Sequence, residues 1–526
     1  MSPPDDIDLT RPQFVGAKVV RREDPRLLSG AGNYVADIKR HGMLHMAFRR
    51  SDHAHAAIRN IDVEAALALP GVVAVYTGGD IAAMANPYQA TSRMKNYQAT
   101  FIPPLAVNKV RYVGEAVVAV VAESRYVAED ALALIDIDYD PLTVLVDPEE
   151  ALKSGAPKLH DDLESNILAE REFARGEVDD AFESAAATAG GRFHFTRTTP
   201  VTIEARAAVA EYDKGARSLT LHCTTQIPGI VRDKLSEIFD LPGPRIRVIA
   251  PDVGGGFGGK TSLYSEEIVA CAVSRALGRP VKWVSDRMED LMTTGHAFDE
   301  VVYADIAVAD DGAIVGLKAD VIGDVGAYSI YPWTATIEPV QVVSFMPGPY
   351  RIENYAARVR SVATNKTMTG AYRGVGRPIS VFVMDRLLDM AARQVRAKVL
   401  DDGRISSSAM EREQRATHGL AWLATYVESL RQLDAYASRL SEQSRYGELE
   451  DLIVRLGFAE YLAQIFGGIP MNQGEIVRLT DLGLTMEDIA DVRTAEIDQL
   501  IADNVPGAGD LTQFRFFTND FDTNTH

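Results

Sequence analysis

Five glycines fall within the seven residues 254–260 (GGGFGGK), and they limit what this part of the chain can form. Residues 245–253 before them have the pattern of a strand, and residues 265–278 after them have the apolar spacing of a helix that ends at a glycine. A tight turn between the two needs only one or two glycines. The excess indicates a backbone that approaches a ligand closely and points N–H groups at it. The following helix N-terminus favours an anion or an oxo group.

The same segment also matches the phosphate-binding loop of nucleotide hydrolases, with Gly254, four residues, Gly259, Lys260 and Thr261. In such a loop Lys260 would contact the β- and γ-phosphates, and the Thr261 hydroxyl would bind magnesium. No apolar strand ending in a suitable magnesium-binding aspartate stands out downstream, and the surroundings are not a βαβ array. A P-loop nucleotide hydrolase is therefore kept as the less favoured alternative.

Two further segments carry groups that suit an anionic or oxo ligand. Arg373 and Arg377 lie among glycines in residues 371–378 (AYRGVGRP), where they would be fixed donors. Gln226 follows a strand in the segment TTQIP and can donate its side-chain amide. Taken alone, each segment also has an ordinary explanation: a surface loop with solvated arginines, or a glutamine whose hydrogen bonds are structural.

Composition excludes several classes of function. The 526 residues carry 54 Lys and Arg against 74 Asp and Glu, and the net charge of −20 argues against nucleic acid as a partner. Two cysteines, Cys223 and Cys271, exclude a disulfide scaffold and a cysteine-ligated iron–sulfur cluster held by this chain alone. The N-terminus is polar and acidic, unlike a signal peptide, and no apolar run is long enough for a membrane span. A soluble, cytoplasmic protein is expected.

The predicted fold class is α+β, because strands and helices mix up to about residue 394 without a regular βαβ repeat. The pattern after that point is helical. Apolar residues at three- and four-residue steps predict a helix over 420–440, and a second predicted helix over 448–466 stops at two glycines. Residues 503–526 show no period, so we expect a disordered tail there.

Together, the segments resemble the large subunit of the molybdenum hydroxylases, the superfamily of xanthine dehydrogenase, aldehyde oxidase and aerobic carbon monoxide dehydrogenase. The resemblance covers about residues 15–394 and rests on motifs in the family's order: GAKVVRREDPRLLSGAGNYVADI, RSDHAHAAI, TTQIP, PDVGGGFGGK, DVGAY and GAYRGVGRP. It implies an N-terminal extension (1–26), an α/β hammerhead domain (27–145), a linker (146–164) and the first of two molybdopterin-binding domains (165–394).

The resemblance also implies the cofactor and the residues that contact it. Gln226 corresponds to the glutamine whose side chain approaches a molybdenum oxo ligand. Gly256, Phe257 and Gly258 correspond to loop positions whose backbone lies against the metal centre, and Arg373 to the arginine beside the cofactor. None of these residues ligates the metal directly. The implied cofactor is molybdopterin or its cytosine dinucleotide form with bound molybdenum.

Some positions depart from the family pattern. Gly374 stands where carbon monoxide dehydrogenases have a cysteine, and Thr261 stands where purine hydroxylases have a substrate-binding glutamate, so both substrates are disfavoured. Residues 200–206 (PVTIEAR) are a loosened version of the family's proline–methionine–glutamate–proline segment. The second molybdopterin domain, whose late glutamate activates the attacking hydroxide, is not found. The sequence therefore assigns no catalytic residue.

The region after the first molybdopterin domain resembles a different family. Residues 395–490 are similar to the helical N-terminal part of methylsuccinyl-CoA dehydrogenase-like acyl-CoA dehydrogenases, through VRAKVLDDGRISSSAMEREQRATHGLAWLATYVESLRQL and GFAEYLAQIFGGIPMNQGEIVRLTDLGL. The parts of that family that hold flavin and the catalytic glutamate are absent. We therefore expect a fusion, with an all-α acyl-CoA dehydrogenase-like segment over 395–502.

The leading expectation is an oxidoreductase large subunit that hydroxylates an aldehyde or a heteroaromatic carbon with water as the oxygen source. Lacking its second domain, the chain is expected to be weak or inactive alone. The resemblance implies an iron–sulfur small subunit and an FAD-binding medium subunit as partners in a hetero-oligomer, and a chain with two cysteines agrees with this. The alternative is a non-catalytic remnant or assembly module of such a complex.

Overall fold

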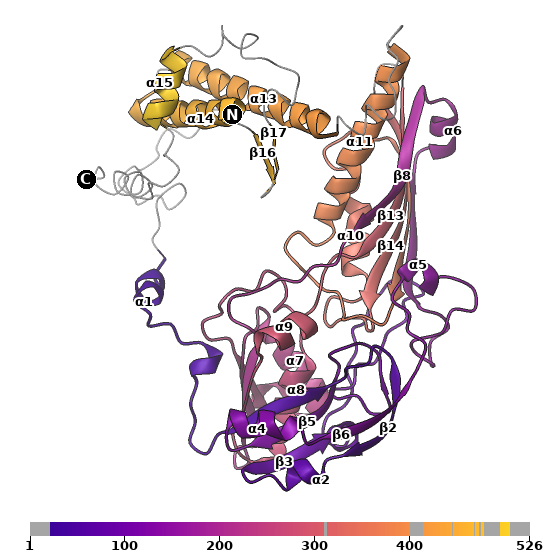
Figure 1. Cartoon of the computed structure of the whole chain (residues 1–526), viewed down its shortest axis with the longest axis vertical. Coiled ribbons are helices and arrows are strands. Elements are labelled where there is room, and N and C mark those ends of the chain that lie inside the picture. The colour runs from indigo at the N-terminus through magenta and orange to yellow at the C-terminus, as the bar shows by residue number, and fades with distance from the viewer. Residues whose placement is uncertain are drawn as a thin grey trace. The chain divides into compact units, whose positions relative to one another are not determined.

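The structure is a computed structural model that describes residues 21–309, 313–399, 414–443, 445–467, 469–472, 475–477 and 495–504. It divides into two compact units, Met1–Val399 and Leu400–His526. Strands and helices alternate irregularly in the described part of the first unit (Figure 1), as the α+β prediction requires.

A seven-stranded sheet joins regions of the first unit that are far apart in sequence. Its order is β11-β10-β9-β12-β1-β5-β3. In that order the strands span Ile246–Ile249, Ser218–Cys223, Ala207–Asp213, Val281–Val284, Leu44–Arg50, Ala116–Ala122 and Val72–Thr77. β1 pairs in parallel with β12. Strands of the predicted hammerhead region and of the predicted molybdopterin-binding region therefore share one sheet.

β5 has the sequence AVVAVVA and is buried along its whole length. Ala119 and Val121 belong to one hydrophobic core, which includes helix α8 (Ser265–Leu277), whereas Val118 and Val120 belong to a second core, which includes helix α4 (Arg125–Leu132). A continuous apolar run is typical of a strand that is covered on both faces.

α8 ends at Gly278 with φ +66°, which confirms the predicted helix end. A left-handed backbone at this position favours glycine. Residues 261–264 connect the glycine-rich segment to the helix, and Leu263 among them belongs to the same hydrophobic core as the helix.

A five-stranded sheet forms the other main layer, in the order β7-β15-β14-β13-β8. These strands span Ile167–Arg175, Asn354–Ala363, Ile314–Gly326, Glu300–Val308 and Ala187–Phe195. Helices α10 (Ile337–Phe345) and α11 (Arg377–Val399) share a hydrophobic core with this sheet, and Figure 1 shows α11 running along β8 and β13. α10 and α11 thereby connect the sheet to the segment around residue 373.

The remaining elements of the first unit are short. A three-stranded sheet contains β4 (Lys109–Val110), β2 (Ala56–Asp62) and β6 (Asp136–Pro141). The other helices are α1 (Asp24–Leu28), α2 (Glu64–Leu67), α3 (Gly78–Ala82), α5 (Pro148–Ala151), α6 (Val178–Glu183), α7 (Pro228–Phe239) and α9 (Arg287–Thr293), with single 3-10 turns at Val35–Asp37 and Gly243–Arg245.

The segment predicted as a linker, 146–164, packs against the rest of the first unit. It contains α5, and both Leu159 and His160 are buried. The His160 Nε2 lies 2.7 Å from the Ala327 carbonyl oxygen. The sequence did not reveal this, because the partners of these residues are distant in the chain.

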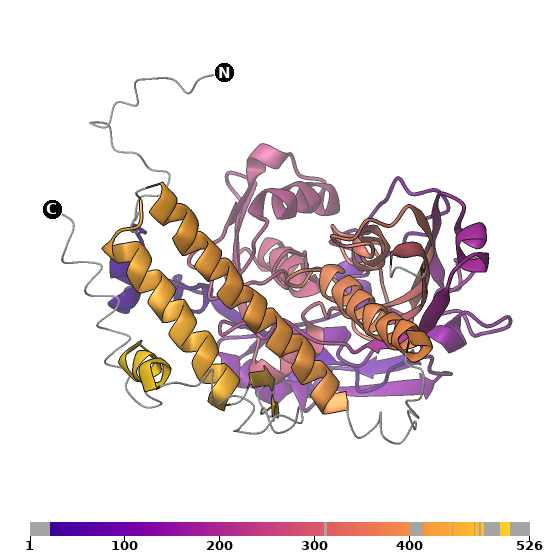
Figure 2. The ribbon, with the colours of Figure 1, turned by 90° about the horizontal axis from the view of Figure 1, so that it is seen from above.

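The second unit is mainly helical where it is described. Helices α13 (Gln414–Glu442) and α14 (Glu448–Gly467) lie side by side in Figure 2, and Tyr426 contacts Tyr461 with ring centroids 5.1 Å apart. Strands β16 (Ile469–Asn472) and β17 (Glu475–Val477) form a hairpin that the prediction of an all-α region omitted. α15 (Ala495–Asn504) includes the first two residues of the predicted tail; residues 505–526 lie outside the described residues.

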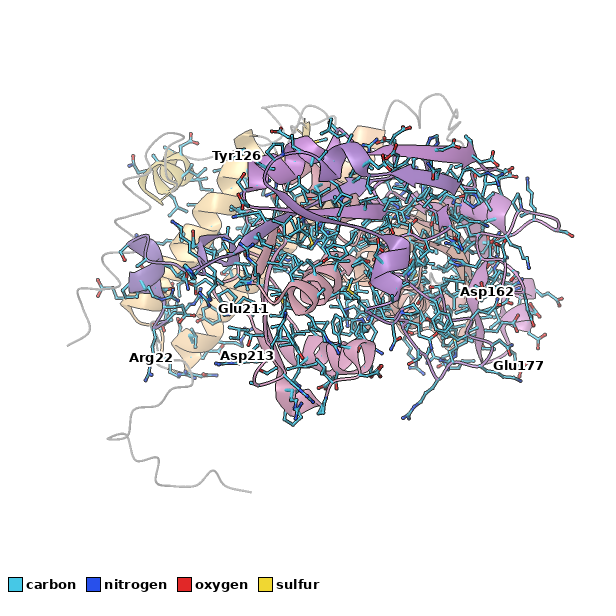
Figure 3. The ribbon with its side chains drawn as sticks, turned by 90° about the horizontal axis from the view of Figure 1, so that it is seen from below. Arg22, Tyr126, Asp162, Glu177, Glu211 and Asp213 are labelled. Carbon is cyan, nitrogen blue, oxygen red and sulfur yellow. The ribbon has the colours of Figure 1, made fainter. Side chains whose placement is uncertain are left out.

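The surface of the first unit carries exposed acidic side chains, among them Asp162, Glu177 and Asp213, which are labelled in Figure 3. This distribution accompanies the net charge of −20. Across the described ranges, no helix has the length and apolar character needed to cross a bilayer.

Candidate functional site

The glycine loop, residues 254–260, lies between β11 and α8 and is shaped by close backbone contacts. Gly255 and Gly258 have φ of +95° and +105°, and Phe257 adopts +49°, a value that only glycine reaches without strain. A Cβ atom at Gly256 would collide with the Gln226 side chain, and one at Gly258 with the Ala371 carbonyl. These glycines are therefore required by what packs against the loop.

Gln226 is fixed by the glycine loop. Its backbone N–H donates to the Lys260 carbonyl oxygen at 2.8 Å, and its side-chain Oε1 accepts from the Gly258 N–H at 3.1 Å. The residue is exposed. The Oε1 contact leaves the Nε2 group of the same amide as an oriented donor beside the loop.

A second loop, residues 371–376, lies against the first and is called the arginine loop here. The Arg373 N–H donates to the Phe257 carbonyl oxygen at 2.9 Å, and a Cβ at Gly258 would lie 3.0 Å from the Tyr372 Cα. Gly374 and Val375 have φ of +95° and +52°. The Arg373 side chain is exposed. Two segments more than a hundred residues apart in sequence thus form one continuous surface.

The groups that these loops leave open are hydrogen-bond donors. The N–H groups of Gly256 and Phe257, Nε2 of Gln226 and the Arg373 guanidinium have no acceptor among the residues that the structure describes. A donor set without a carboxylate suits an anionic or oxo-bearing group. The structure therefore brings together all the residues that the sequence predicted to contact a cofactor: Gln226, Gly256, Phe257, Gly258 and Arg373.

Lys260 and Thr261 do not have the geometry of a phosphate-binding loop. The Lys260 side chain is 1% exposed and donates to the Glu204 carbonyl and carboxylate oxygens at 2.8 and 3.1 Å. Burial lowers its pKa, although Glu204 opposes this effect. The Thr261 hydroxyl donates to the Gly258 carbonyl oxygen and accepts from the Trp333 Nε1. Neither group faces a ligand, so the P-loop alternative was wrong.

Residues 200–204 support the glycine loop from one side. The Glu204 carboxylate accepts from the Gly254 N–H at 2.7 Å, and a Cβ at Gly259 would collide with Pro200. Two apolar side chains of this segment are exposed, Val201 by 57% and Ile203 by 95%, beside Phe257 at 50%. The sequence identified this segment only as a departure from a family motif.

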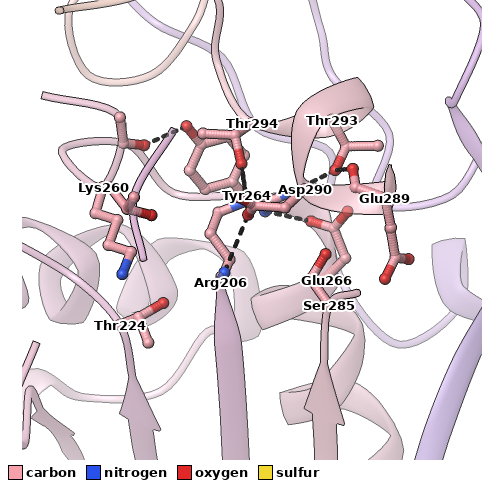
Figure 4. A network of polar contacts seen from close by, with 12 residues as sticks. Arg206, Thr224, Lys260, Tyr264, Glu266, Ser285, Glu289, Asp290, Thr293 and Thr294 are labelled. Atoms are coloured by element: carbon pink, nitrogen blue, oxygen red, sulfur yellow. Dashed lines mark hydrogen bonds and ion pairs between the residues drawn. The ribbon is translucent and has the colours of Figure 1, made fainter. Parts of the chain in front are cut away.

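Behind the glycine loop lies a buried network that the sequence did not predict (Figure 4). The Arg206 guanidinium donates to Glu266, Thr294 and Thr293 at 2.9, 2.8 and 2.6 Å, and its carbon lies 3.9 Å from the Tyr264 ring centroid. The Arg206 backbone N–H donates to Asp290 at 3.0 Å. This network joins β9 to α8 and α9.

The network continues into the predicted hammerhead region. Arg50, at the end of β1, donates to Glu266 at 2.7 Å and to Glu289 at 2.6 Å. Burial alone would raise the pKa of Glu266, but Arg206 and Arg50 outweigh it and lower that pKa to about 2. Glu266 is therefore ionised and paired on both oxygens.

Other residues with reactive chemistry are structural. Cys223 and Cys271 are buried free thiols whose pKa values are raised by burial. The His55 Nδ1 lies 2.7 Å from the Thr143 carbonyl oxygen. The described residues contain no group of three or more His, Cys, Asp or Glu that could hold a metal ion.

A cavity of about 550 Å³ lies apart from both loops. It is lined by residues of β1, α4 and α9, including Phe48, Arg125 and Met288, and by none of the predicted cofactor residues. We place the candidate site at the two loops rather than here, because the loops bring backbone N–H groups, an amide and a guanidinium without acceptors in the described ranges onto one surface.

Comparison with known proteins assigns the parts of the first unit. Residues 159–401 match the family model of the molybdopterin cofactor-binding domain, and residues 29–143 match that of the aldehyde oxidase and xanthine dehydrogenase a/b hammerhead domain. The nicotine 6-hydroxylase large subunit of Paenarthrobacter nicotinovorans is 37% identical over 75% of this chain. The quinoline 2-oxidoreductase of Pseudomonas putida 86 is 41% identical over 72% of this chain, with a TM-score of 0.70.

The chain spans about half the length of these two proteins, 48% of each. The nicotinate dehydrogenase large molybdopterin subunit of Eubacterium barkeri differs: it is 30% identical over 70% of this chain, and the match covers 83% of its own length. The carbon monoxide dehydrogenase large chain of Afipia carboxidovorans is 34% identical over 93% of this chain and 62% of its own length, so this match extends beyond residue 399. The acyl-CoA dehydrogenase resemblance stays a prediction.

Proposed function

Because this chain belongs to the family of molybdenum hydroxylase large subunits, we propose that its first unit supplies one half of a molybdenum cofactor site in an oxidoreductase. The complete enzyme would hydroxylate an aldehyde or a heteroaromatic carbon of a small molecule, with oxygen from water. The second half of the site would come from a second molybdopterin-binding domain, outside the residues matched here.

One observation carries this proposal: the glycine loop and the arginine loop are joined by the Arg373 N–H to Phe257 carbonyl bond, and their open polar groups are donors. The cofactor combines phosphate groups with oxo groups, both of which accept hydrogen bonds. Backbone N–H groups and a guanidinium held in fixed positions suit such acceptors without reorganisation.

When bound, the cofactor supplies the two-electron oxidation of the substrate carbon. The residues of this chain orient it. Gln226 would donate from Nε2 to an oxo group, because its Oε1 is held by the Gly258 N–H. The N–H groups of Gly256 and Phe257 would bind neighbouring acceptors, and Arg373 would neutralise negative charge. No carboxylate of the described residues faces these donors, and the family resemblance places the base in the second molybdopterin-binding domain.

The side chains around the loops favour an apolar substrate. Phe257 in the glycine loop and Val201 and Ile203 in the segment that supports it expose apolar surface. Thr261 provides no carboxylate for a purine, and its hydroxyl is already bonded within the protein. A cysteine at Gly374, as in carbon monoxide dehydrogenases, would need φ of +95° and would lie 2.9 Å from the Pro378 ring. These features support an aldehyde or heteroaromatic substrate over a purine or carbon monoxide.

We propose three partner chains in a hetero-oligomer. Two would carry the iron–sulfur clusters and FAD, because Cys223 and Cys271 are buried in the core and cannot hold a cluster. The third would carry the second molybdopterin domain. The match to the nicotinate dehydrogenase large molybdopterin subunit covers 83% of that protein, which supports a molybdopterin subunit of about this extent.

The alternative proposal is a non-catalytic assembly module. It is favoured only by the exposed apolar residues Val201, Ile203 and Phe257, which would then be a docking surface rather than a substrate wall. The two proposals differ in whether the donors of the two loops ever hold a cofactor.

Metal analysis distinguishes these proposals. The chain is produced in a host that makes molybdenum cofactor, alone and together with chains bearing the second molybdopterin, iron–sulfur and FAD domains. We expect little molybdenum in the chain alone and close to one molybdenum per complex in the assembly, followed by aldehyde or heteroaromatic oxidation. A stable assembly without molybdenum would contradict the enzymatic proposal and support the assembly module.

A further inference from the structure

Two buried glutamates lie directly behind the arginine loop. Glu300 begins β13 and Glu338 lies in the first turn of α10, and they are 1% and 2% exposed. One residue joins them: a Cβ at Gly323, which pairs with Glu300 across β13 and β14, would lie 3.5 Å from the Glu300 Oε1 and collide with Pro339 beside Glu338. The Glu300 carboxyl therefore lies where the first turn of α10 contacts the sheet, close enough for the Glu338 carboxyl to raise the pKa of Glu300.

Most oxygens of the two carboxyls lack a hydrogen-bond donor in the described part of the chain. Both oxygens of Glu300 and Oε1 of Glu338 are buried without a hydrogen-bond donor among the described residues. Only the Glu338 Oε2 has a donor, the Phe298 N–H at 2.7 Å. Leaving two charges buried in this state would be very costly, and a proton on either carboxyl removes one of them.

The neighbouring cations are engaged elsewhere. Arg197 and Lys366 donate to Asp299 at 2.7 and 2.8 Å, and the same two cations contact Asp324 at 3.3 and 2.8 Å. The His194 Nε2 also lies 3.4 Å from Asp299. Burial raises the pKa of both glutamates, and the negative charge of Asp299 adds to this effect.

α10 carries the arginine loop. A Cβ at Gly376 would lie 2.6 Å from the Glu338 carbonyl oxygen, so the loop rests on the first turns of the helix. Arg377, which follows the loop, donates to Gln341 at 3.1 Å, and the Ser380 hydroxyl donates to the Val342 carbonyl oxygen at 2.8 Å.

Glu338 also reaches the loop along a second path. The Phe298 whose N–H it accepts packs against Tyr372, with ring centroids 5.7 Å apart. Tyr372 precedes Arg373 in the arginine loop. A displacement of α10 would therefore disturb two separate sets of contacts with the arginine loop.

We propose that the Glu300–Glu338 pair carries a proton that holds α10 on the sheet and thereby positions the arginine loop, and that loss of this proton loosens the loop. Both glutamates are positioning residues, since neither lies among the groups that face the ligand. The consequence for cofactor binding rests on the proposed function, but the positioning itself does not.

The direction of the pH effect follows from the raised pKa values. We call the state with α10 displaced from the sheet the open state. Well below the ordinary glutamate pKa of 4.5, both carboxyls are protonated in the folded and in the open state, so the packing of α10 on the sheet is most stable there. As pH rises above this value, the open state ionises first, and opening becomes easier until the folded carboxyls ionise as well. The limit is about tenfold in the opening equilibrium per pH unit for each proton released.

Hydrogen exchange of the full chain without cofactor tests the proposal. The readout is the protection factor of the Arg373 and Val375 amides, which donate to Phe257 and Tyr372. Between about pH 5 and about pH 8 we expect the wild type to lose protection, by up to about tenfold per pH unit. Glu338→Gln should flatten this slope, because an amide at this position still accepts from the Phe298 N–H but does not titrate. Glu300→Gln should do the same, and serves if Glu338→Gln does not fold.

Glu267→Gln is the matched control. Glu267 is a buried carboxyl whose pKa is raised by burial to about 7, but it caps α8 through the Tyr264 N–H. The Glu267→Gln variant should leave the pH dependence of the Arg373 and Val375 protection factors unchanged. A slope in Glu338→Gln and Glu300→Gln equal to that of the wild type would overturn the proposal, as would full protection in Glu338→Ala at low pH. Because no cofactor is present, either result is independent of the proposed enzymatic function.

Discussion

The two loops of the site are backed by buried charges of opposite character. Behind the glycine loop, Arg206 and Arg50 pair with Glu266 on both of its oxygens. Behind the arginine loop, Glu300 and Glu338 form no ion pair among the described residues, because Arg197 and Lys366 pair with Asp299 and Asp324. One side of the site therefore rests on a paired network and the other on an acid pair that needs a proton. The two sides should differ in stability and respond to pH in opposite directions.

Removing Arg206 should have the largest effect on the paired side. Arg206→Ala leaves Glu266 with a buried charge that Arg50 compensates only in part, and breaking such a buried pair typically costs about 3–5 kcal/mol. Chemical denaturation measures the free energy of unfolding. Arg232→Ala, which removes an exposed partner of Asp233, should cost no more than about 1 kcal/mol. Similar losses of unfolding free energy in Arg206→Ala and Arg232→Ala would show that the buried network does not stabilise the fold.

The paired side should weaken in acid. The pKa of Glu266 is lowered to about 2 in the folded state, from an ordinary value of 4.5, so its contribution to stability is fully present above 4.5 and is lost as pH falls through about 2. Unfolding free energy measured over this range should decline in the wild type and be flatter in Glu266→Gln. The acid pair predicts the opposite trend for the arginine loop, which weakens as pH rises. A common direction for both would remove the distinction between the two sides.

Gly258 tests the contact between the loops. Gly258→Ala places a Cβ at φ +105° against the Ala371 carbonyl oxygen, which should cost roughly 1–3 kcal/mol and separate the loops. Gly155→Ala has φ +83° but nothing within 4 Å, so it isolates the backbone strain from the collision. Denaturation together with hydrogen exchange at Arg373 should show a larger loss in Gly258→Ala. Equal losses would mean that the loops do not depend on this contact.

The smallest effect is expected at Gly374. Gly374→Cys requires φ +95° and places the Cβ 2.9 Å from the Pro378 ring, which should cost about 1–2 kcal/mol. In an assembled enzyme this variant should not gain carbon monoxide oxidation, because the loop conformation accommodates glycine. An unchanged unfolding free energy would indicate that the loop adapts, and that Gly374 does not determine the substrate.

Local patterns pointed to the two loops as places for a ligand. Glycine spacing and neighbouring arginines indicated an anionic or oxo ligand, and the resemblance to the molybdenum hydroxylases implied that Gln226, Phe257 and Arg373 belong to one site. The structure places these three residues together. The sequence also gave Lys260 a formal match to a phosphate loop, and only its contact with Glu204 showed that it points inward.

What supports the loops could not be predicted. Arg206 meets Glu266, and Glu300 lies beside Glu338, only because the sheet pairings and helix packing bring distant segments together. A single charged residue in a mixed sequence carries no signal of burial or of its partner. The hairpin of β16 and β17 was missed for a related reason, since both strands are too short to show a period of two.

The central claim is that the two loops together hold one cofactor, and Arg373 provides its most direct test. Molybdenum content is measured in the assembled complex for the wild type, for Arg373→Gln and for Arg386→Gln, which removes an exposed arginine paired with Asp389 further along α11. We expect Arg373→Gln to lose most of the bound molybdenum and Arg386→Gln to retain it. Full molybdenum content in Arg373→Gln, in a complex that is otherwise folded and assembled, would contradict a cofactor site at these loops.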